Sequence, residues 1–336
     1  MLVKIPLVDI GTASPVELVR LFPDHALTLA DAAKSTFGPT SRAIAEAGLP
    51  LADHISRRWL ERADNPYRQE IDELAALLGI RGTWFLNVCF EWGCTTGVWD
   101  TDGGPLLRRV LDWPFPKLGE NLVVAKQHAK AGPLLNITWP GFNGVLQAMA
   151  PDRFAAAINQ APVRRRGAGY AGDWLHARVA VSKSADLPPA HLLRRVFETA
   201  PDYAAAKDLL CHTPIAVPAI FILSGLIAGE GCVIERTENA FALRGMEGGQ
   251  VCAGNHFESQ PADTRQGWRP RPIDSFGRVQ CARGLPPGLE GFDWFIPPIA
   301  NAHSRLAFTA NAASHALALR GVHGIEPVTQ TLTLAA

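Results

Sequence analysis

The segment from Leu86 to Phe115, LNVCFEWGCTTGVWDTDGGPLLRRVLDWPF, constrains the fold of this chain more than any other. An Asp-Gly-Gly turn signal separates two apolar runs within it, which is typical of a β-hairpin. Folding the segment about Asp102 is expected to bring Arg109 opposite Cys94, with Asp112 just beyond. A thiol, a guanidinium and a carboxylate are therefore predicted to converge at one end of a two-stranded ribbon.

The composition indicates a globular protein and not a disordered one. Hydrophobic residues make up 47% of the 336 residues and charged residues 19%, enough for a substantial core. Basic and acidic residues both number 32, so nothing favours nucleic acid or an anionic membrane surface as a partner. The one basic run, Arg164-Arg165-Arg166, is interpreted as a solvated loop.

The N-terminal residues MLVKIPLVDIG lack the long apolar core and cleavage site of a signal peptide. No window approaches the roughly 18 apolar residues of a membrane-spanning helix. By default we expect a cytoplasmic protein, which could form a homo-oligomer.

Six cysteines are present, without a CxxC pair or a zinc-type Cys/His spacing. We therefore expect no metal site, no other cofactor and no disulfide framework. Five of the cysteines are interpreted as small buried apolar residues. Only Cys94 has neighbours that would favour a thiolate.

The pattern of periodicities changes at Cys94. Residues 1 to 93 are expected to be mostly helical, with helices at 16–21, 26–33, 40–47, from 65 onward to Gly79, and at 81–91. Strands are predicted at 122–129, 133–139, 144–150, 154–160, 217–224, 232–236, 240–244, 251–254 and within 305–320 and 327–334. Helices are predicted at 190–199, 202–210 and 273–282. This order indicates two sheets packed face to face between helical outer layers, an α+β fold.

Cleavage of the bond between Gly93 and Cys94 would give one residue two catalytic groups. Cys94 would then carry both a thiol and a free α-amine, and an α-amine with a pKa of about 7.7 can accept the thiol proton near neutral pH. Arg109 would stabilise the thiolate, and Asp112 could hold the amine by a hydrogen bond. Gly93 has no side chain that would keep the Cys94 thiol away from the Gly93 carbonyl.

These residues resemble the cysteine N-terminal-nucleophile (Ntn) amidases: acid ceramidase, N-acylethanolamine acid amidase and, more distantly, the choloylglycine hydrolases and penicillin V acylases. The resemblance is strongest at Gly93-Cys94-Thr95-Thr96 and at Arg109-Val110-Leu111-Asp112-Trp113. It extends upstream to Glu70-Ile71-Asp72-Glu73-Leu74 and to Leu86-Asn87-Val88-Cys89-Phe90-Glu91. Downstream it includes 139–146, 158–160, 233–237, 252–257 and 274–278.

The resemblance implies a four-layer αββα Ntn-hydrolase sandwich that cleaves itself before Cys94. Residues 1–93 would then form one chain and 94–336 the catalytic chain, together one folded unit. It also implies an oxyanion hole made by the Asn255 side-chain amide and a backbone N–H near Asn159, and a site arginine at Arg278. Such a donor contributes about 3 kcal/mol to transition-state stabilisation.

Three residues depart from the family pattern: Val110 replaces an Asn, Gln160 replaces a Glu, and Gly254 replaces a Thr. They leave open the electrostatics of the site and the geometry of one loop. Trp139, Phe142 and Trp174 are candidates for an apolar acyl pocket, with core packing as the alternative. Gln160 is placed with them as a substrate-binding candidate.

We therefore predict an amidohydrolase that cleaves linear, non-peptide C–N bonds of N-acyl small molecules through a Cys94 thioester. Three alternatives remain open. An acyltransferase would pass the same thioester to an amine, a thiol hydrolase assisted by His128 would need no cleavage, and a binding protein of the same fold would stay uncut. His256 is interpreted as structural.

Overall fold

The computed structural model describes residues 2–35, 38–88, 92–259, 267–269, 271 and 273–334. The Cys89-Phe90-Glu91 part of the upstream motif lies outside them. The helices are α1 (Val16–Leu21), α2 (Pro23–Ser35), α3 (Gly38–Arg62), α4 (Arg68–Leu78), α5 (Thr83–Asn87), α6 (Gly169–Val181), α7 (Pro189–Thr199), α8 (Tyr203–His212) and α9 (Ser275–Arg283), with a 3₁₀ turn at Gly119–Asn121.

The strands occur in runs between groups of these helices. They are β1 (Leu7–Gly11), β2 (Gly93–Trp99), β3 (Leu106–Asp112), β4 (Val123–Ala129), β5 (Gly132–Thr138), β6 (Gln147–Ala150), β7 (Phe154–Gln160), β8 (Val163–Arg164), β9 (Ala219–Ser224), β10 (Gly231–Arg236), β11 (Phe241–Gly245), β12 (Gln250–Ala253), β13 (Trp268–Arg269), β14 (Ser304–Asn311), β15 (Ala316–His323), β16 (Glu326–Pro327) and β17 (Leu332–Leu334).

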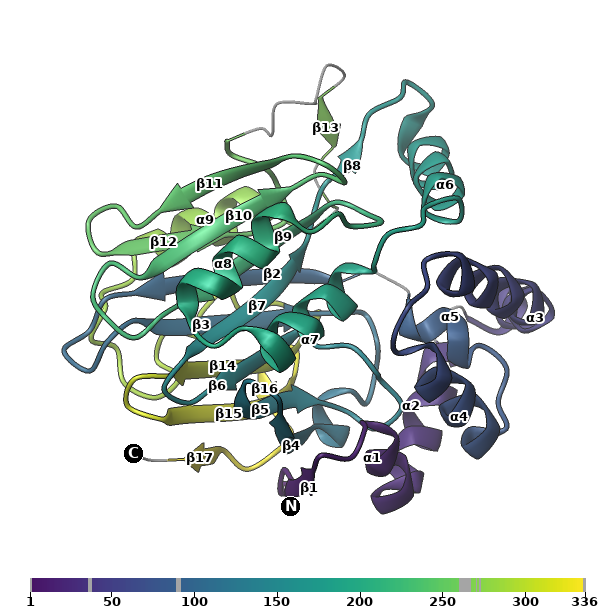
Figure 1. Cartoon of the computed structure of the whole chain (residues 1–336), viewed down its shortest axis with the longest axis horizontal. Helices are drawn as coiled ribbons and strands as arrows, with labels where there is room; N and C mark the ends of the chain where they lie inside the picture. The colour runs from purple at the N-terminus through teal and green to yellow at the C-terminus, as the bar shows by residue number, and fades with distance from the viewer. Residues whose placement is uncertain are drawn as a thin grey trace.

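Two large sheets form the centre of the molecule (Figure 1). The eight-stranded sheet has the order β1-β4-β5-β6-β7-β9-β10-β11, and the seven-stranded sheet has the order β12-β2-β3-β14-β15-β16 with β17 beside β15. Contacts between β2 and both β7 and β9 show that the sheets pack face to face. Their inner faces share one apolar core, because alternate residues of each strand point inward.

Helices cover both outer faces of this sandwich. α7 and α8 pack against the eight-stranded sheet, and α9 packs against β12 and β2 of the other sheet. The predicted αββα layering is therefore confirmed. The helices α1 to α5 lie together at one end of the sandwich, and α6 stands beside β8 and β13 above them (Figure 1).

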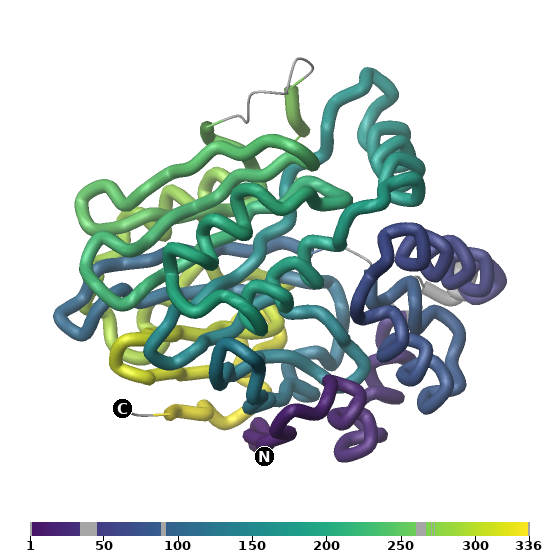
Figure 2. Tube along the Cα trace, viewed as in Figure 1, coloured from purple at the N-terminus to yellow at the C-terminus, as the bar shows by residue number. Residues whose placement is uncertain are grey.

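The N-terminal segment is tied into the sheets as well as being helical. β1 pairs in parallel with β4, and an isolated bridge joins Val3 to Thr329, so the two ends of the described chain run side by side (Figure 2). The core cluster that contains Leu111 also includes Leu60 and Trp84 from the segment before Cys94.

The structure differs from the predicted elements in several places. α3 is one helix of 25 residues where only 40–47 was predicted, and it continues through Pro50. α6, β1, β8 and β13 were not predicted. The helix predicted from Asn65 begins at Arg68 instead, because the Asn65 side chain accepts a bond from the Tyr67 N–H and closes a turn first. The α5 helix covers only part of 81–91.

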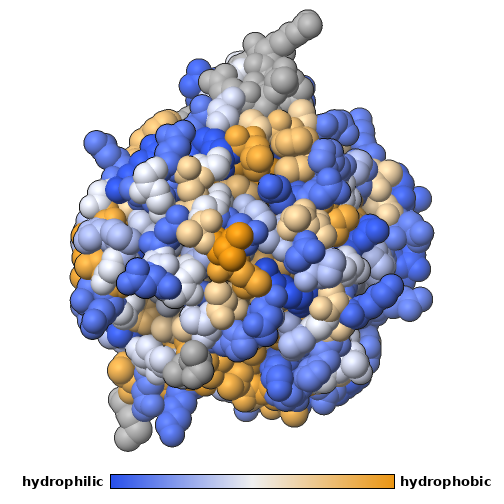
Figure 3. All heavy atoms as spheres, turned by 60° about the vertical axis from the view of Figure 1, so that its left-hand side comes forward, coloured by the Kyte–Doolittle hydropathy of each residue, from blue (hydrophilic) through white to orange (hydrophobic). Residues whose placement is uncertain are grey.

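Among the described residues, no helix combines the length and the apolar character needed to cross a membrane. On the face drawn in Figure 3, hydrophobic residues form small separate areas between hydrophilic ones. The expectations of a cytoplasmic location and of a homo-oligomer stay predictions.

Candidate active site

The β2–β3 hairpin has a different register from the one predicted. Cys94 pairs with Leu111, Thr96 pairs with Arg109, and Gly93 pairs with Asp112. The turn is longer than expected, since the strands stop at Trp99 and resume at Leu106. Arg109 therefore lies diagonally across from Cys94 on the same face, a separation that a long side chain spans.

The Cys94 thiol is fully buried between the two sheets. Arg109 donates from Nη2 to the Cys94 Sγ at 3.1 Å, and its Nη1 donates to the Leu146 carbonyl at 2.6 Å. Burial raises the pKa of the thiol to about 11 in the intact chain, and the neighbouring Arg109 only partly offsets that effect. Before any cleavage the sulfur is therefore a neutral thiol already held by a guanidinium.

Asp112 lies on the opposite face of the same ribbon. Its carboxylate accepts a bond from the Ser304 Oγ at 2.7 Å and pairs with Arg278 at 3.2 Å. Alternate strand residues face opposite sides of a sheet, so this carboxylate lies on the α9 side, beside the backbone of Gly93 and away from the thiol. Burial raises the pKa of Asp112, although Arg278 counters that shift.

Arg278 gathers several groups around the Cys94 backbone. Its Nη1 donates to the Cys94 carbonyl and to Thr95 Oγ1, the latter at 2.7 Å, and its Nη2 donates to Asn255 Oδ1 at 2.8 Å. It projects from α9, whose first turn is capped by Asp274. The guanidinium therefore joins Asp112, Cys94 and Asn255 beneath one helix.

Asn255 holds the bond that would be cut. Its Oδ1 accepts the Cys94 N–H at 2.9 Å, and its Nδ2 donates to the Gln160 carbonyl at 2.9 Å. The residue follows β12, which is the neighbour of β2 in the sheet. The pairing of Ala253 with Thr96 sets the distance from this loop to Cys94.

Asn159 connects the two sheets next to this point. Its Oδ1 accepts a bond from Thr96 Oγ1 at 2.7 Å, and its Nδ2 donates to the carbonyls of Ala253 and Gly254 at 3.1 Å each. The Asn159 side chain thus faces inward from β7. The Gln160 side chain takes the other face and lines a hollow under α6.

Trp139 and Phe142 lie in a different hollow. Their rings stack at 4.9 Å, and Trp139 meets Trp113 edge to face at 5.8 Å. With Trp113 they line an apolar hollow that α2 and α5 close from the N-terminal side. The six predicted catalytic residues therefore gather around the Gly93–Cys94 bond. The predicted substrate-binding residues divide between two hollows, because Trp174 lines the hollow of Gln160 and not that of Trp139 and Phe142.

Two of the three departures from the family pattern have a structural explanation. Val110 points to the α9 side, where it packs in an apolar cluster with Trp99 and Phe292, so it does not face the thiol. At Gly254 a Cβ would come within 2.5 Å of Ser275 Oγ and 3.0 Å of the Ser275 carbonyl. α9 therefore packs too closely on this loop for a larger residue.

Sequence reasoning missed the role of Ser275. Its Oγ accepts the Asn255 N–H at 2.6 Å and bonds His256 Nδ1 at 2.7 Å. Ser275 thereby fixes the backbone that carries Asn255. A serine after a helix-capping aspartate was the only sequence signal, and it does not reveal a partner twenty residues away.

No histidine hydrogen-bonds to Cys94 in the part of the chain that the structure describes. His128 lies on β4, half exposed, 3.4 Å from Asp9. His256 stacks on Phe276 at 3.9 Å, and burial lowers its pKa, so it is neutral at pH 7. Within the described residues there is also no group of three His, Cys, Asp or Glu side chains placed to hold a metal ion.

The two facing sheets between helical layers, with a cysteine second in β2, define the fold of the Ntn hydrolases. A solved structure of the *Caenorhabditis elegans* N-acylethanolamine-hydrolyzing acid amidase ortholog matches this chain with a TM-score of 0.51 at 19% identity, covering 72% of this chain and 100% of that one. The fold expected from the sequence is therefore confirmed.

Curated proteins with similar sequences include two amidases. The chain is 25% identical over 178 residues to the N-acylethanolamine-hydrolyzing acid amidase of Cavia porcellus, covering 51% of this chain and 48% of that protein. It is 35% identical over 101 residues to Homo sapiens acid ceramidase, covering 30% of this chain and 24% of that protein. The resemblance to these amidases is confirmed, although the chain matches only about half of the first relative and a quarter of the second. No family model matches the chain.

Proposed function

We propose that this protein hydrolyses linear, non-peptide amide bonds of N-acyl small molecules, after it has cut itself between Gly93 and Cys94. One observation carries the proposal: the Cys94 sulfur is held by Arg109 while the Cys94 N–H is held by Asn255. Both atoms needed for an N-terminal nucleophile are thus held in place before any cut. The names of the relatives, which are amidases and ceramidases, support the same reaction class.

Self-cleavage begins with attack of the Cys94 sulfur on the Gly93 carbonyl carbon. The thiol first loses its proton to solvent, the Gly93–Cys94 C–N bond breaks as the sulfur attacks, the leaving nitrogen takes a proton from water, and a thioester forms. Water then hydrolyses the thioester and leaves a Gly93 carboxylate, a free thiol and a free α-amine. A Cβ at Gly93 would lie 3.0 Å from Ile273 Cδ1 and 3.3 Å from the Asp112 Cβ, so glycine suits the close packing at the start of β2.

The same thiol then acts on the substrate. The α-amine, with a pKa near ~7.7, accepts the thiol proton as the sulfur attacks the amide carbonyl. The Asn255 amide and a backbone N–H near Asn159 stabilise the oxyanion, each by about 3 kcal/mol. The substrate amine leaves with the proton, and water hydrolyses the new thioester. In this proposal Asp112, the cross-strand partner of Gly93, holds the new amine through its carboxylate.

The direct test is release of a fatty acid and an amine from a panel of N-acyl amides, followed by mass spectrometry. We expect turnover by the wild type and none by Cys94→Ala. A Cys211→Ala variant, which removes another buried thiol on α8, serves as the matched control and is expected to remain active. Hydroxylamine added to the assay separates hydrolysis from acyl transfer. Predominant acyl hydroxamate at low hydroxylamine would indicate a transferase, and turnover by Cys94→Ala would refute the proposed nucleophile.

A further inference from the structure

A histidine, a serine and an asparagine form a continuous chain of hydrogen bonds beside the predicted cleavage site. The Ser275 Oγ lies 2.7 Å from His256 Nδ1 and accepts the Asn255 N–H at 2.6 Å. The Asn255 Oδ1 in turn accepts the Cys94 N–H at 2.9 Å. His256 is thus linked through two side chains to the bond that the proposed reaction cuts, although no step of that reaction uses it.

The Ser275 hydroxyl has one hydrogen to donate. Because its oxygen already accepts the Asn255 N–H, the hydroxyl can give this hydrogen to His256 Nδ1. A neutral imidazole accepts at Nδ1 when its own proton lies on Nε2. Ser275 and His256 are 2% and 6% exposed, so a hydroxyl without this acceptor would be a buried unsatisfied donor. We therefore assign Ser275 as the donor and His256 as the group that orients its hydroxyl.

The charges around His256 favour this neutral form. Glu258 Oε1 lies 3.7 Å from Nε2, on the side of the ring where the assigned proton sits, and Glu258 is itself paired with Arg283. Arg244, Arg278 and Arg283 are the cations that act on the ring. Burial and these arginines lower the pKa of His256 against the opposing effect of Glu258. The ring therefore remains an acceptor at Nδ1 near neutral pH.

The position of the His256 ring is fixed by its neighbours. The buried Glu235 of β10 accepts the N–H groups of Glu258 and Ser259 at 2.9 Å each, which anchors the chain just after the histidine. The ring itself stacks on Phe276, the second residue of α9, at 3.9 Å. His256 therefore offers its acceptor nitrogen from a constant place.

A serine, a histidine and a carboxylate are also the parts of a hydrolase triad, but Ser275 is not placed as a nucleophile. Its oxygen accepts a backbone N–H, and a Cβ at Gly254 would come within 2.5 Å of it. A nucleophilic hydroxyl must instead be open to a substrate carbonyl. The arrangement is suited to holding the Asn255 backbone.

We infer that His256 is a positioning residue for the reaction at Cys94. It acts through the Ser275 hydroxyl, which holds the Asn255 backbone and so sets where the Asn255 amide meets the Cys94 N–H. The inference rests on the proposed function, in which Asn255 serves both self-cleavage and the oxyanion. It gives His256 a part in the reaction beyond packing.

Two substitutions separate positioning from packing. His256→Asn loses the ring but keeps an acceptor oxygen close to the place of Nδ1, whereas His256→Phe keeps a stacked ring and loses the acceptor. We expect self-cleavage to slow by about tenfold in His256→Phe, which leaves a buried hydroxyl unpaired, and by less than about threefold in His256→Asn. A packing role predicts the reverse order. His212→Phe, at an exposed histidine of α8 that meets Phe241 edge to face, is the matched control and should cleave at the wild-type rate.

Ser275→Ala tests the same contact without enlarging a side chain. We expect it to slow self-cleavage by at least about tenfold, because the Asn255 N–H also loses its acceptor. In the Ser275→Ala chain, adding His256→Phe should change the rate by no more than about twofold, since both substitutions remove one path of interaction. Effects that multiply would contradict a path through Ser275.

Amide hydrogen exchange separates this inference from the reaction itself. In the uncut Cys94→Ala chain, the N–H of residue 94 should exchange about tenfold faster when Ser275→Ala or His256→Phe is added, and less than about threefold faster with His256→Asn. That pattern supports the inference even if the wild type does not cut itself, which would refute only the proposed function. Faster self-cleavage by His256→Phe than by His256→Asn, or unchanged exchange at residue 94 with Ser275→Ala, would overturn the inference.

Discussion

Asn255 Oδ1 accepts two hydrogen bonds, one from the Cys94 N–H at 2.9 Å and one from the Arg278 guanidinium at 2.8 Å. A single amide oxygen therefore links the predicted cleavage site to α9. Asn255 is fully buried. The position of the Gly93–Cys94 bond therefore depends on the Asn255 side chain.

Asn255→Ala should therefore block self-cleavage more than it destabilises the protein. We expect cleavage to slow by at least about a hundredfold, the cost of misplacing reacting groups by about 1 Å. Quantitative electrophoresis of freshly translated chain gives the rate. Asn136→Ala, which removes another buried asparagine on β5, is the control and should process normally. Normal cleavage in Asn255→Ala would refute the role of Asn255 in self-cleavage.

Gly254→Thr, which restores the family residue, should impair this site. The new side chain would meet Ser275 Oγ at 2.5 Å, displace Ser275 and thereby release the Asn255 N–H. We expect cleavage at least about tenfold slower, in line with a displaced positioning contact.

Gly245→Thr offers the matched control, since a Cβ there meets nothing within 4 Å. It should process at the wild-type rate. If Gly254→Thr cleaved itself as fast as Gly245→Thr, the close packing of α9 on this loop would have no functional consequence.

Self-cleavage should accelerate as the pH rises. The pKa of the buried Cys94 thiol is raised to about 11, so the thiolate is the minor form below that pH and grows about tenfold per unit. Between about pH 6 and pH 9 we expect the first-order rate of cleavage in freshly translated chain to rise steeply. A rate that is flat or falls over this range would contradict attack by the thiolate of the intact chain.

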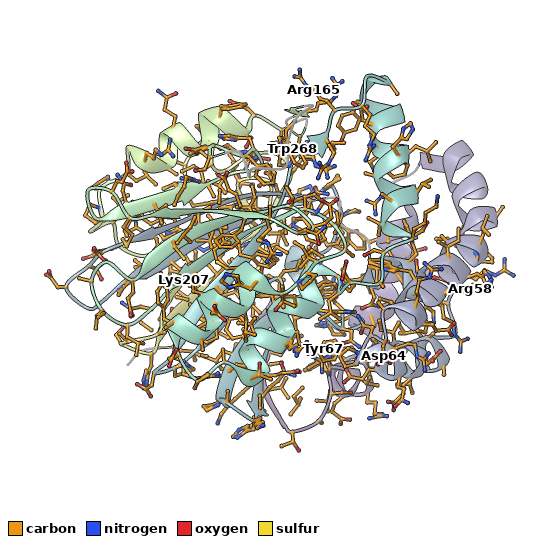
Figure 4. All side chains as sticks on the ribbon, turned by 45° about the horizontal axis from the view of Figure 1, so that its top comes forward. Arg58, Asp64, Tyr67, Arg165, Lys207 and Trp268 are labelled. Atoms are coloured by element: carbon orange, nitrogen blue, oxygen red, sulfur yellow. The ribbon has the colours of Figure 1, made fainter. Side chains whose placement is uncertain are left out.

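The predicted N-terminal fragment should stay bound after the cut. Arg194 on α7 pairs with Glu70 at 2.7 Å and with Glu198 at 2.8 Å, and Tyr67 donates to Glu198 at 2.6 Å. Figure 4 shows Tyr67 where the N-terminal helices meet the rest of the molecule. Arg194→Ala would leave Glu70 half-buried without its partner, which costs about 3 kcal/mol.

We expect Arg194→Ala to lower the melting temperature and to release fragment 1–93 on gel filtration of cleaved protein. Arg20→Ala breaks the exposed pair of Arg20 with Glu73 and is the control, with an expected effect below about 1 kcal/mol. Equal behaviour of the two variants would refute a role for the buried network in holding the fragment.

Local patterns predicted most of the fold. The strands around the site carry alternating or continuous apolar runs, so their positions agree with the structure to within a few residues, and β7 agrees at both ends. α3 and α6 were harder, because Pro50 interrupts one and Gly169 and Gly172 weaken the helical signal of the other. Their helical state depends on packing that no local pattern records.

For the site too, the sequence predicts the contacts made within one hairpin but not those that depend on distant packing. Cys94, Arg109 and Asp112 lie on one hairpin, so the sequence brings them close, although the length of the turn moved the register by two residues. The alternation of β7 could have separated Asn159 from Gln160, since neighbouring strand residues face opposite sides. The contact of Ser275 with the Asn255 loop depends on how α9 packs, which the sequence does not show.

The central claim is that the chain cuts itself before Cys94, and intact mass under denaturing, reducing conditions tests it most directly. The account predicts two fragments that end at Gly93 and begin at Cys94, and a single uncut chain for Cys94→Ala. A single full-length mass for the wild type after incubation between about pH 4 and pH 9, the range over which carboxylates and amines titrate, would contradict it.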